Sequence, residues 1–212
     1  MKTAIKLLVV LCCALFATSA FANWVKFRVP LSLLDTHCGN GRCAPSAYFD
    51  TNRSWGYYRD YACGIKTYNQ HDGIDYAIGG FWAMDQGRWV MAAASGTVIE
   101  THDGEFDRCT TANCGTANYV KIRHADGKVT VYWHLKKWSV RVRPGQWVGC
   151  GTVIGNVGSS GYSTGPHLHF GVVVPCHGAD DPYGASNSAC GGGFSYWVNQ
   201  GAYLKLPGLT CQ

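Results

Sequence analysis

The sequence predicts an all-β protein, built mainly as an antiparallel β sandwich or barrel with loop-rich, disulfide-containing extensions. Of the 212 residues, 27 are glycine, 13% are aromatic and only 15% are charged, a composition that favours strands and turns over helices. Short runs of β-branched and aromatic residues recur through the middle of the chain, and turn signals such as Asp126-Gly127 and Pro144-Gly145 separate them. Short strands at such regular spacing are typical of sandwiches and barrels.

The first 22 residues are predicted to be a secretory signal peptide. Residues 1–6 carry two lysines, residues 7–16 form a short apolar run, and Ala20-Phe21-Ala22 places small residues where cleavage is expected. The alternative is a membrane anchor, but the apolar run is too short to span ~30 Å of hydrocarbon. We therefore expect cleavage near Ala22/Asn23, a secreted or periplasmic product and no integral membrane segment.

The length and charge of the mature chain limit its functional class. Cleavage leaves 190 residues (212 − 22), which fits one domain with extensions. Because Lys2 and Lys6 leave with the signal, 18 basic residues fall to 16, against 13 acidic residues. This mild positive charge suits weak attraction to an anionic surface such as a cell wall, but it is not the signature of nucleic-acid binding. We expect a monomer without a nucleic-acid partner.

Nine cysteines follow the predicted signal peptide and, in a secreted chain, they predict disulfides. The pairs Cys38/Cys43 and Cys109/Cys114 are each five residues apart and could close local loops. The remaining connectivity does not follow from sequence, and because nine is odd, at least one cysteine is free or paired elsewhere. A cysteine-based zinc site is the rival interpretation, but the sequence contains no C-x-x-C pair. The nine are Cys38, Cys43, Cys63, Cys109, Cys114, Cys150, Cys176, Cys190 and Cys211.

Three segments follow the signal peptide in chain order. Residues 23–65 are expected to form a loop-rich N-terminal segment, either wrapped on the core or acting as a short pro-region. Its aromatic residues Trp55, Tyr57 and Tyr58 are expected to pack rather than to line a groove. Residues 66–174 form the predicted core, and residues 175–212 form a Cys/Gly-rich C-terminal extension.

The core contains the predicted strands. An Asp-Gly pair tolerates the positive φ of a tight hairpin, so residues 125–128 are expected to join two antiparallel strands. Elsewhere the strands are recognised by β-branched and aromatic residues between glycine- or proline-containing turns. The expected strands cover residues 74–78, 89–94, 96–100, 119–124, 129–135, 140–143, 147–148, 152–154 and 167–174.

Three places in the core could carry chemistry. His71 and Asp75 are four residues apart, so both would lie on one face of a strand. His134 lies near the end of the predicted strand 129–135. His167 and His169 alternate on a strand, so they share a face with Cα atoms about 6.6 Å apart. Each place alone is also compatible with ordinary core or surface residues.

Taken together, these places predict a catalytic metal site. Histidine nitrogen and carboxylate oxygen are common zinc ligands, and a catalytic zinc takes three of them and leaves one position open. Four histidines and one carboxylate therefore supply three ligands and leave two histidines to transfer protons.

Three motifs extend this prediction to a family. H-x-x-x-D, Y-x-H-L and G-Y-S-T-G-P-H-L-H-F, in this order, resemble the lysostaphin-type zinc endopeptidases, which cut peptide crosslinks of bacterial peptidoglycan. The resemblance runs over residues 66–174, roughly half the chain. It implies a compact antiparallel β core with a substrate groove across it.

The resemblance also implies roles for single residues. His71, Asp75 and His169 would hold one Zn²⁺. His134 and His167 would stand near the metal-bound water, one as general base and the other as transition-state stabiliser. The resemblance leaves open which histidine takes which role.

Substrate contacts are expected from four further residues. Ser163 and Thr164 would line the groove, and Tyr132 and Tyr162 could donate hydrogen bonds to the substrate. Members of the family often have glutamate where this chain has Gly171, which implies different support for the site rather than lost activity.

Alternatives to this interpretation remain open. Related families on the same fold, such as leukocyte cell-derived chemotaxin 2, bind or signal without catalysis, and a glycine-rich protein such as elastin could replace peptidoglycan as substrate. Glycine bridges and D-amino-acid crosslinks are not distinguished. The four remaining histidines are expected to be structural or exposed, with His124 in solvent beside its turn; they are His37, His102, His124 and His177.

Overall fold

A computed structural model describes residues 24–33, 38, 43–52, 54–111, 114–184 and 193–212. The predicted signal peptide therefore lies outside the described residues. Within them, no helix is long and apolar enough to cross a membrane.

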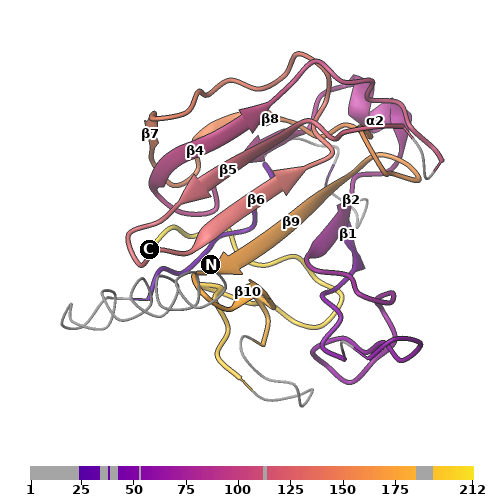
Figure 1. Cartoon of the computed structure of the whole chain (residues 1–212), viewed down its shortest axis with the longest axis vertical. Coiled ribbons are helices and arrows are strands. Elements are labelled where there is room, and N and C mark those ends of the chain that lie inside the picture. The colour runs from indigo at the N-terminus through magenta and orange to yellow at the C-terminus, as the bar shows by residue number, and fades with distance from the viewer. Residues whose placement is uncertain (1–23, 34–37, 39–42, 53, 112–113, 185–192) are drawn as a thin grey trace, which may run out of the picture.

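In the described part of the chain, eight strands form one antiparallel sheet in the order β1-β2-β9-β6-β5-β4-β7, with β10 also paired to β9. The remaining strands, β3 and β8, form an antiparallel two-stranded sheet. Figure 1 shows β4, β5, β6 and β9 side by side. The prediction of an antiparallel all-β protein is confirmed. The elements are β1 (Ala44–Ala47), β2 (Ile74–Ala77), α2 (Phe81–Asp85), β3 (Trp89–Met91), β4 (Gly96–His102), β5 (Tyr119–Arg123), β6 (Val129–Trp133), β7 (Trp147–Val148), β8 (Val153–Asn156), β9 (His167–Val174) and β10 (Gly178–Asp180).

Strand β9 is the longest strand and lies between β2 and β6. Its sequence HLHFGVVV alternates, so Leu168, Phe170 and Val172 enter the hydrophobic core and are fully buried. His167 and His169 consequently share the opposite face. Apolar burial on one face therefore fixes which way both histidines point.

The observed strands depart from the predicted ones in several places, among them β6, which ends at Trp133 and not at residue 135. Residues 140–143 form no strand. The Arg141 N–H donates to the Ile154 carbonyl of β8, but the N–H groups on either side, of Val140 and Arg143, donate to the Asp103 and Gln146 side chains, so no ladder develops. The strand predicted at 89–94 ends at Met91. Strands β1 and β10 and the five-residue α2 were not predicted.

The N-terminal segment is built into the main sheet and the core. β1 pairs with β2, placing Ala47 opposite Asp75, while Phe27, Val29 and Leu31 are fully buried. The described part of this segment is therefore wrapped on the core.

Disulfides are present at both predicted local pairs, Cys38–Cys43 and Cys109–Cys114. A third bond, Cys150–Cys211, ties the C-terminal end to the turn before β8. Cys63 and Cys176 are also disulfide-bonded. The ninth cysteine, Cys190, lies outside the described residues.

Candidate metal centre

Two neighbouring strands and the loop before one of them bring His71, Asp75 and His169 together. β2 pairs with β9 so that Asp75 stands directly opposite His169. His71 Nε2 lies 3.1 Å from Asp75 Oδ1 and 3.2 Å from His169 Nδ1, and His169 Nδ1 lies 3.0 Å from Asp75 Oδ1. Three ligand-type atoms thus converge on one point.

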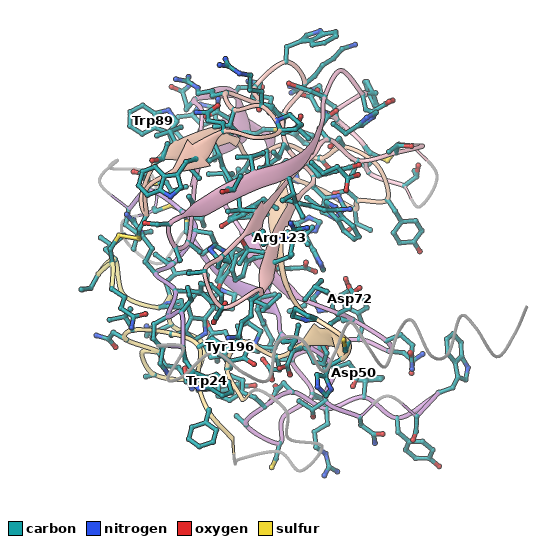
Figure 2. All side chains as sticks on the ribbon, turned by 60° about the vertical axis from the view of Figure 1, so that its left-hand side comes forward. Trp24, Asp50, Asp72, Trp89, Arg123 and Tyr196 are labelled. Carbon is teal, nitrogen blue, oxygen red and sulfur yellow. A yellow bond between two sulfur atoms is a disulfide. The ribbon has the colours of Figure 1, made fainter. Side chains whose placement is uncertain are left out.

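The route by which His71 reaches this point differs from the predicted one. His71 precedes β2 and is not on the strand, so the shared strand face is not what aligns it with Asp75. The preceding residue, Gln70, has a φ of 64°, and its N–H donates to Asp50 Oδ2 at 2.9 Å. The loop is therefore folded back on the N-terminal segment, and Figure 2 labels Asp50 and Asp72 on the two segments involved.

Glycine at position 73 allows this close approach. A Cβ atom there would lie 2.6 Å from His169 Cε1 and Nε2 and 2.7 Å from the Phe170 carbonyl oxygen. Such distances are shorter than van der Waals contact, so no other residue type fits without moving β9.

The donor set fits zinc. Zinc bonds of 2.0–2.1 Å to nitrogen and oxygen, arranged tetrahedrally, place ligand atoms about 3.3 Å apart, close to the observed 3.0–3.2 Å. Two histidine nitrogens and one carboxylate oxygen form a common catalytic ligand set, and all three residues are buried. Among the described residues, this group alone has the spacing of a metal site.

Within the triad, charge interactions and burial shift the pKa values of Asp75 and His71 in opposite directions. Burial by itself would raise the pKa of Asp75, but hydrogen bonds from His169 and His71 hold that pKa well below its usual range. Burial would lower the pKa of His71, yet Asp75 raises it overall. The Asp75 carboxylate is therefore ionised, which is the form that binds a cation.

His134 and His167 lie beside the triad with their rings 4.5 Å apart. His167 Nε2 is 3.6 Å from Asp75 Oδ1, and the His134 ring is 6.1 Å from that of His169. The Nδ1–H groups of His134 and His167 donate to the carbonyls of Ser160 and Gly165, so each Nε2 keeps its lone pair. Both rings can therefore accept a proton at Nε2.

Burial sets the charge of His134. It lowers the pKa of His134 to about 3, with smaller contributions from His167 and His169. The ring is thus neutral throughout the neutral pH range.

A cavity of about 340 Å³ opens beside the three histidines His71, His134 and His169. Aromatic and small residues form most of its wall, and Asp72 contributes a carboxylate. The lining residues are Tyr68, Gln70, His71, Asp72, Gly115, Thr116, Ala117, Tyr119, Trp133, His134, Tyr162 and His169.

The four expected substrate-contacting residues separate into two groups. Tyr162 lines the cavity and Thr164 is exposed, so both are available to a ligand. Tyr132 is fully buried and accepts a hydrogen bond from the Ala93 N–H, and Ser163 is buried against Ser159. Both hydroxyl groups therefore make their hydrogen bonds inside the protein.

Two further expectations about exposure are wrong. His124 is buried, and burial lowers its pKa, because the N-terminal segment covers the 125–128 turn through Val25 N–H to Asp126 Oδ2 and packing of Phe27 on His124. Trp55, Tyr57 and Tyr58 do not pack: Trp55 is 83% exposed. Their loop is held by the Asp50 carboxylate, which accepts backbone N–H groups, rather than by aromatic packing.

Sequence reasoning missed three residues that support the triad. Tyr68 stacks on His71 at 4.2 Å and donates its hydroxyl to Asp75 Oδ2 at 3.2 Å. Trp133 stacks on His169 at 5.3 Å, and Asp72 Oδ1 lies 3.5 Å from His169 Nε2. Trp133 and Asp72 each adjoin a motif histidine, but only strand register and loop path show which histidine they contact.

Comparison with known proteins matches this chain to a peptidase family and to several of its members. Residues 69–181, which are 113 of the 212, match Peptidase family M23. The DD-carboxypeptidase/endopeptidase Mpg of Neisseria meningitidis serogroup B is 41% identical over 109 residues, which are 50% of this chain and 20% of that protein. Lysostaphin of Staphylococcus simulans is 36% identical over 131 residues, 61% of this chain and 23% of that protein. The chain thus spans less than a quarter of the length of these curated relatives.

Solved structures give similar matches. The catalytic domain of lysostaphin from Staphylococcus simulans is 34% identical, with 60% of this chain and 86% of that chain covered and a TM-score of 0.43. A point mutant of the catalytic domain of the prophage-encoded M23 protein EnpA from Enterococcus faecalis is 27% identical, with 71% and 96% covered and a TM-score of 0.47.

Proposed function

The chain belongs to peptidase family M23, and from this premise we propose that it is a secreted or periplasmic zinc-dependent endopeptidase. Its substrate would be the peptide crosslinks of bacterial peptidoglycan, because relatives that are named as acting on peptidoglycan or as endopeptidases match it. The observation that carries the proposal is the triad of His71, Asp75 and His169 with two further histidines beside it.

The residues divide the chemistry between them. His71, Asp75 and His169 would hold Zn²⁺, which when bound polarises a carbonyl oxygen and lowers the pKa of water towards about 7. His134 Nε2 and His167 Nε2 both face this place with free lone pairs. They can therefore accept a proton from water and return it to the leaving amine.

The two histidines are suited to different parts of that transfer. Because burial lowers the pKa of His134 to about 3, its ring accepts a hydrogen bond but does not stay protonated. We assign proton carriage to His167, whose side chain is 15% exposed and whose Nε2 lies 3.6 Å from the anionic Asp75. His134 then orients the attacking water.

Mass spectrometry of the products from defined muropeptides tests this function. Wild-type chain loaded with zinc should release fragments with new amino termini, while His134→Ala and His167→Ala should lose about 10²–10⁴-fold in kcat and keep one zinc per chain. His169→Ala should lose zinc as well. A wild-type protein that releases no fragment from either glycine-bridged or D-amino-acid-crosslinked muropeptides would disprove the proposal.

A further inference from the structure

Three of the four site histidines donate their outer N–H to a backbone carbonyl. Such an acceptor is part of the folded chain and cannot rotate away, so it fixes the tautomer and directs Nε2 into the site. The pairs are His71 with Tyr48, His134 with Ser160 and His167 with Gly165, at nitrogen–oxygen distances of 2.6, 2.7 and 2.8 Å.

His169 is turned the other way. Its Nδ1 faces Asp75 and His71, so Nε2 is the outer nitrogen and carries the proton when Nδ1 acts as a ligand. The group facing Nε2 is a side chain: Asp72 Oδ1 lies 3.5 Å away.

Stacking alone does not define the orientation of His169. Trp133 lies nearly parallel to the ring, with an interplanar angle of 23°, and so fixes its plane. A 180° flip keeps that plane but exchanges Nδ1 with Cδ2, and an apolar stack hardly distinguishes the two states. A carboxylate does distinguish them, because it accepts from Nε2–H and not equally from carbon.

We propose that Asp72 is the positioning residue that selects the metal-binding orientation of His169. This rests on the zinc centre of the proposed function. Within the described part of the chain, His169 is the ion-pair partner of the Asp72 carboxylate, at 3.5 Å. A charge-assisted hydrogen bond is about 2.7–2.9 Å long, and a side chain that is 48% exposed can rotate to close the remaining gap.

A side chain at position 171 could also reach His169 Nε2. A Cβ built on Gly171 would lie 3.7 Å from His169 Nε2, which is ordinary contact distance, so a side chain fits there. A carboxylate on that side chain could replace the one at position 72. This makes a rescue experiment available.

The test measures the zinc dissociation constant of the full chain by competition with a chromogenic chelator. Asp72→Ala should weaken zinc binding about 10–100-fold, the usual loss when an outer partner of a ligand is removed. Asp72→Asn, which keeps an acceptor oxygen but not the charge, should lie between. Adding Gly171→Glu to Asp72→Ala should recover part of the affinity.

Asp85→Ala is the matched control, because its side chain is 47% exposed and the change in net charge is the same. Thermal unfolding of the metal-free proteins should show Asp72→Ala folded as the wild type. The proposal is overturned if the zinc affinity of Asp72→Ala lies within twofold of that of Asp85→Ala. If the wild type binds zinc but cuts no muropeptide, the proposed function fails and this positioning role is still measured; a wild type that binds no zinc overturns both.

Discussion

His134 adopts a left-handed backbone conformation, with a φ of 63°, directly after β6. Residues other than glycine rarely take this conformation, which costs about 1–3 kcal/mol and persists where surrounding contacts demand it. Here it ends the strand and points the imidazole at the Ser160 carbonyl and the His167 ring. Local strain at this residue is therefore part of how the His134 ring is brought beside the His167 ring.

Asp181 is a second residue with an unusual environment, and it is not part of the candidate metal centre. One carboxylate oxygen accepts the Tyr183 N–H at 2.9 Å, and the other is buried without a partner among the described residues. Burial, reinforced by Asp180 and Asp60, raises the pKa of Asp181 to about 7. The fold thus keeps this carboxyl group protonated up to about pH 7, well above the range in which an ordinary aspartate ionises.

Replacement of this carboxyl by an amide should change how stability depends on pH. An unfolded Asp loses its proton near pH 4 and the folded Asp181 near pH 7, so the free energy of unfolding of the wild type falls as pH rises between these values. The loss would reach at most about 4 kcal/mol, at about 1.4 kcal/mol per pKa unit. Asp181→Asn should therefore gain stability over the wild type at pH 8 relative to pH 4.5 in urea titrations.

A control variant separates the effect of Asp181 from the effects of other groups that titrate between pH 4.5 and pH 8. Asp85→Asn changes an exposed carboxylate and should shift stability by a similar small amount at both pH values. An Asp181→Asn variant whose stability difference from wild type is equal at pH 4.5 and pH 8 would show that Asp181 titrates normally.

At the scale of elements, the site depends on the register of three adjacent strands. β9 lies between β2 and β6, and His169 faces Asp75 on one side and Trp133 on the other. A slip of one residue would turn every side chain of β9 to the opposite face. The core residues Leu168 and Phe170 prevent that slip, since exposing them would cost several kcal/mol.

The approach of the β2 loop to β9 makes Gly73→Ala a sensitive probe. The added methyl group would meet the His169 ring at 2.6 Å and the Phe170 carbonyl at 2.7 Å, and the carbonyl belongs to a central strand that moves little. We expect a loss of about 1–3 kcal/mol in unfolding free energy and a zinc stoichiometry well below one. Both are measured on the purified variant.

Gly165→Ala provides the comparison for that variant. It lies in the loop before β9, and a Cβ there would have no neighbour within 4 Å. It should keep both zinc and stability. Full zinc occupancy in Gly73→Ala would mean that the loop and β9 can separate without harm to the site.

At the scale of the whole molecule, the segments outside residues 69–181 complete the structure around the matched region. The N-terminal segment supplies β1 and the Tyr48 carbonyl that orients His71. The C-terminal extension packs Trp197 against Phe27 and Phe170. Both segments therefore contribute to the core that supports the candidate metal centre.

The Cys150–Cys211 bond closes a long loop and should contribute more stability than the local bonds. The separation of 61 residues predicts about 4 kcal/mol from loop-closure entropy, against about 2 kcal/mol for the separation of five in Cys109–Cys114. The double variant Cys150→Ser/Cys211→Ser should lose about 2–4 kcal/mol in urea unfolding and keep its zinc. A smaller loss than in Cys109→Ser/Cys114→Ser would contradict the entropic ranking.

Local patterns in the sequence were enough to predict the central strands, the turn at 125–128 and the two short-range disulfides. They were enough because side-chain alternation along a strand and the closure of a five-residue loop involve only near neighbours. For the same reason, the common face of His167 and His169 could be predicted. The assignment of a zinc ligand set came from the order of three motifs and the family they resemble.

Contacts between distant segments could not be predicted in this way. The burial of His124, the exposure of Trp55, the packing of Tyr132 and the contact of Asp72 with His169 each depend on the path of a segment remote in sequence. So do the neighbours of His167 and His169, which come from β2, from β6 and from His134 directly after β6. The sequence of a strand specifies which of its side chains share a face. Which strand or loop then packs against that face depends on how the whole chain buries its apolar residues, and this is a property of the folded structure.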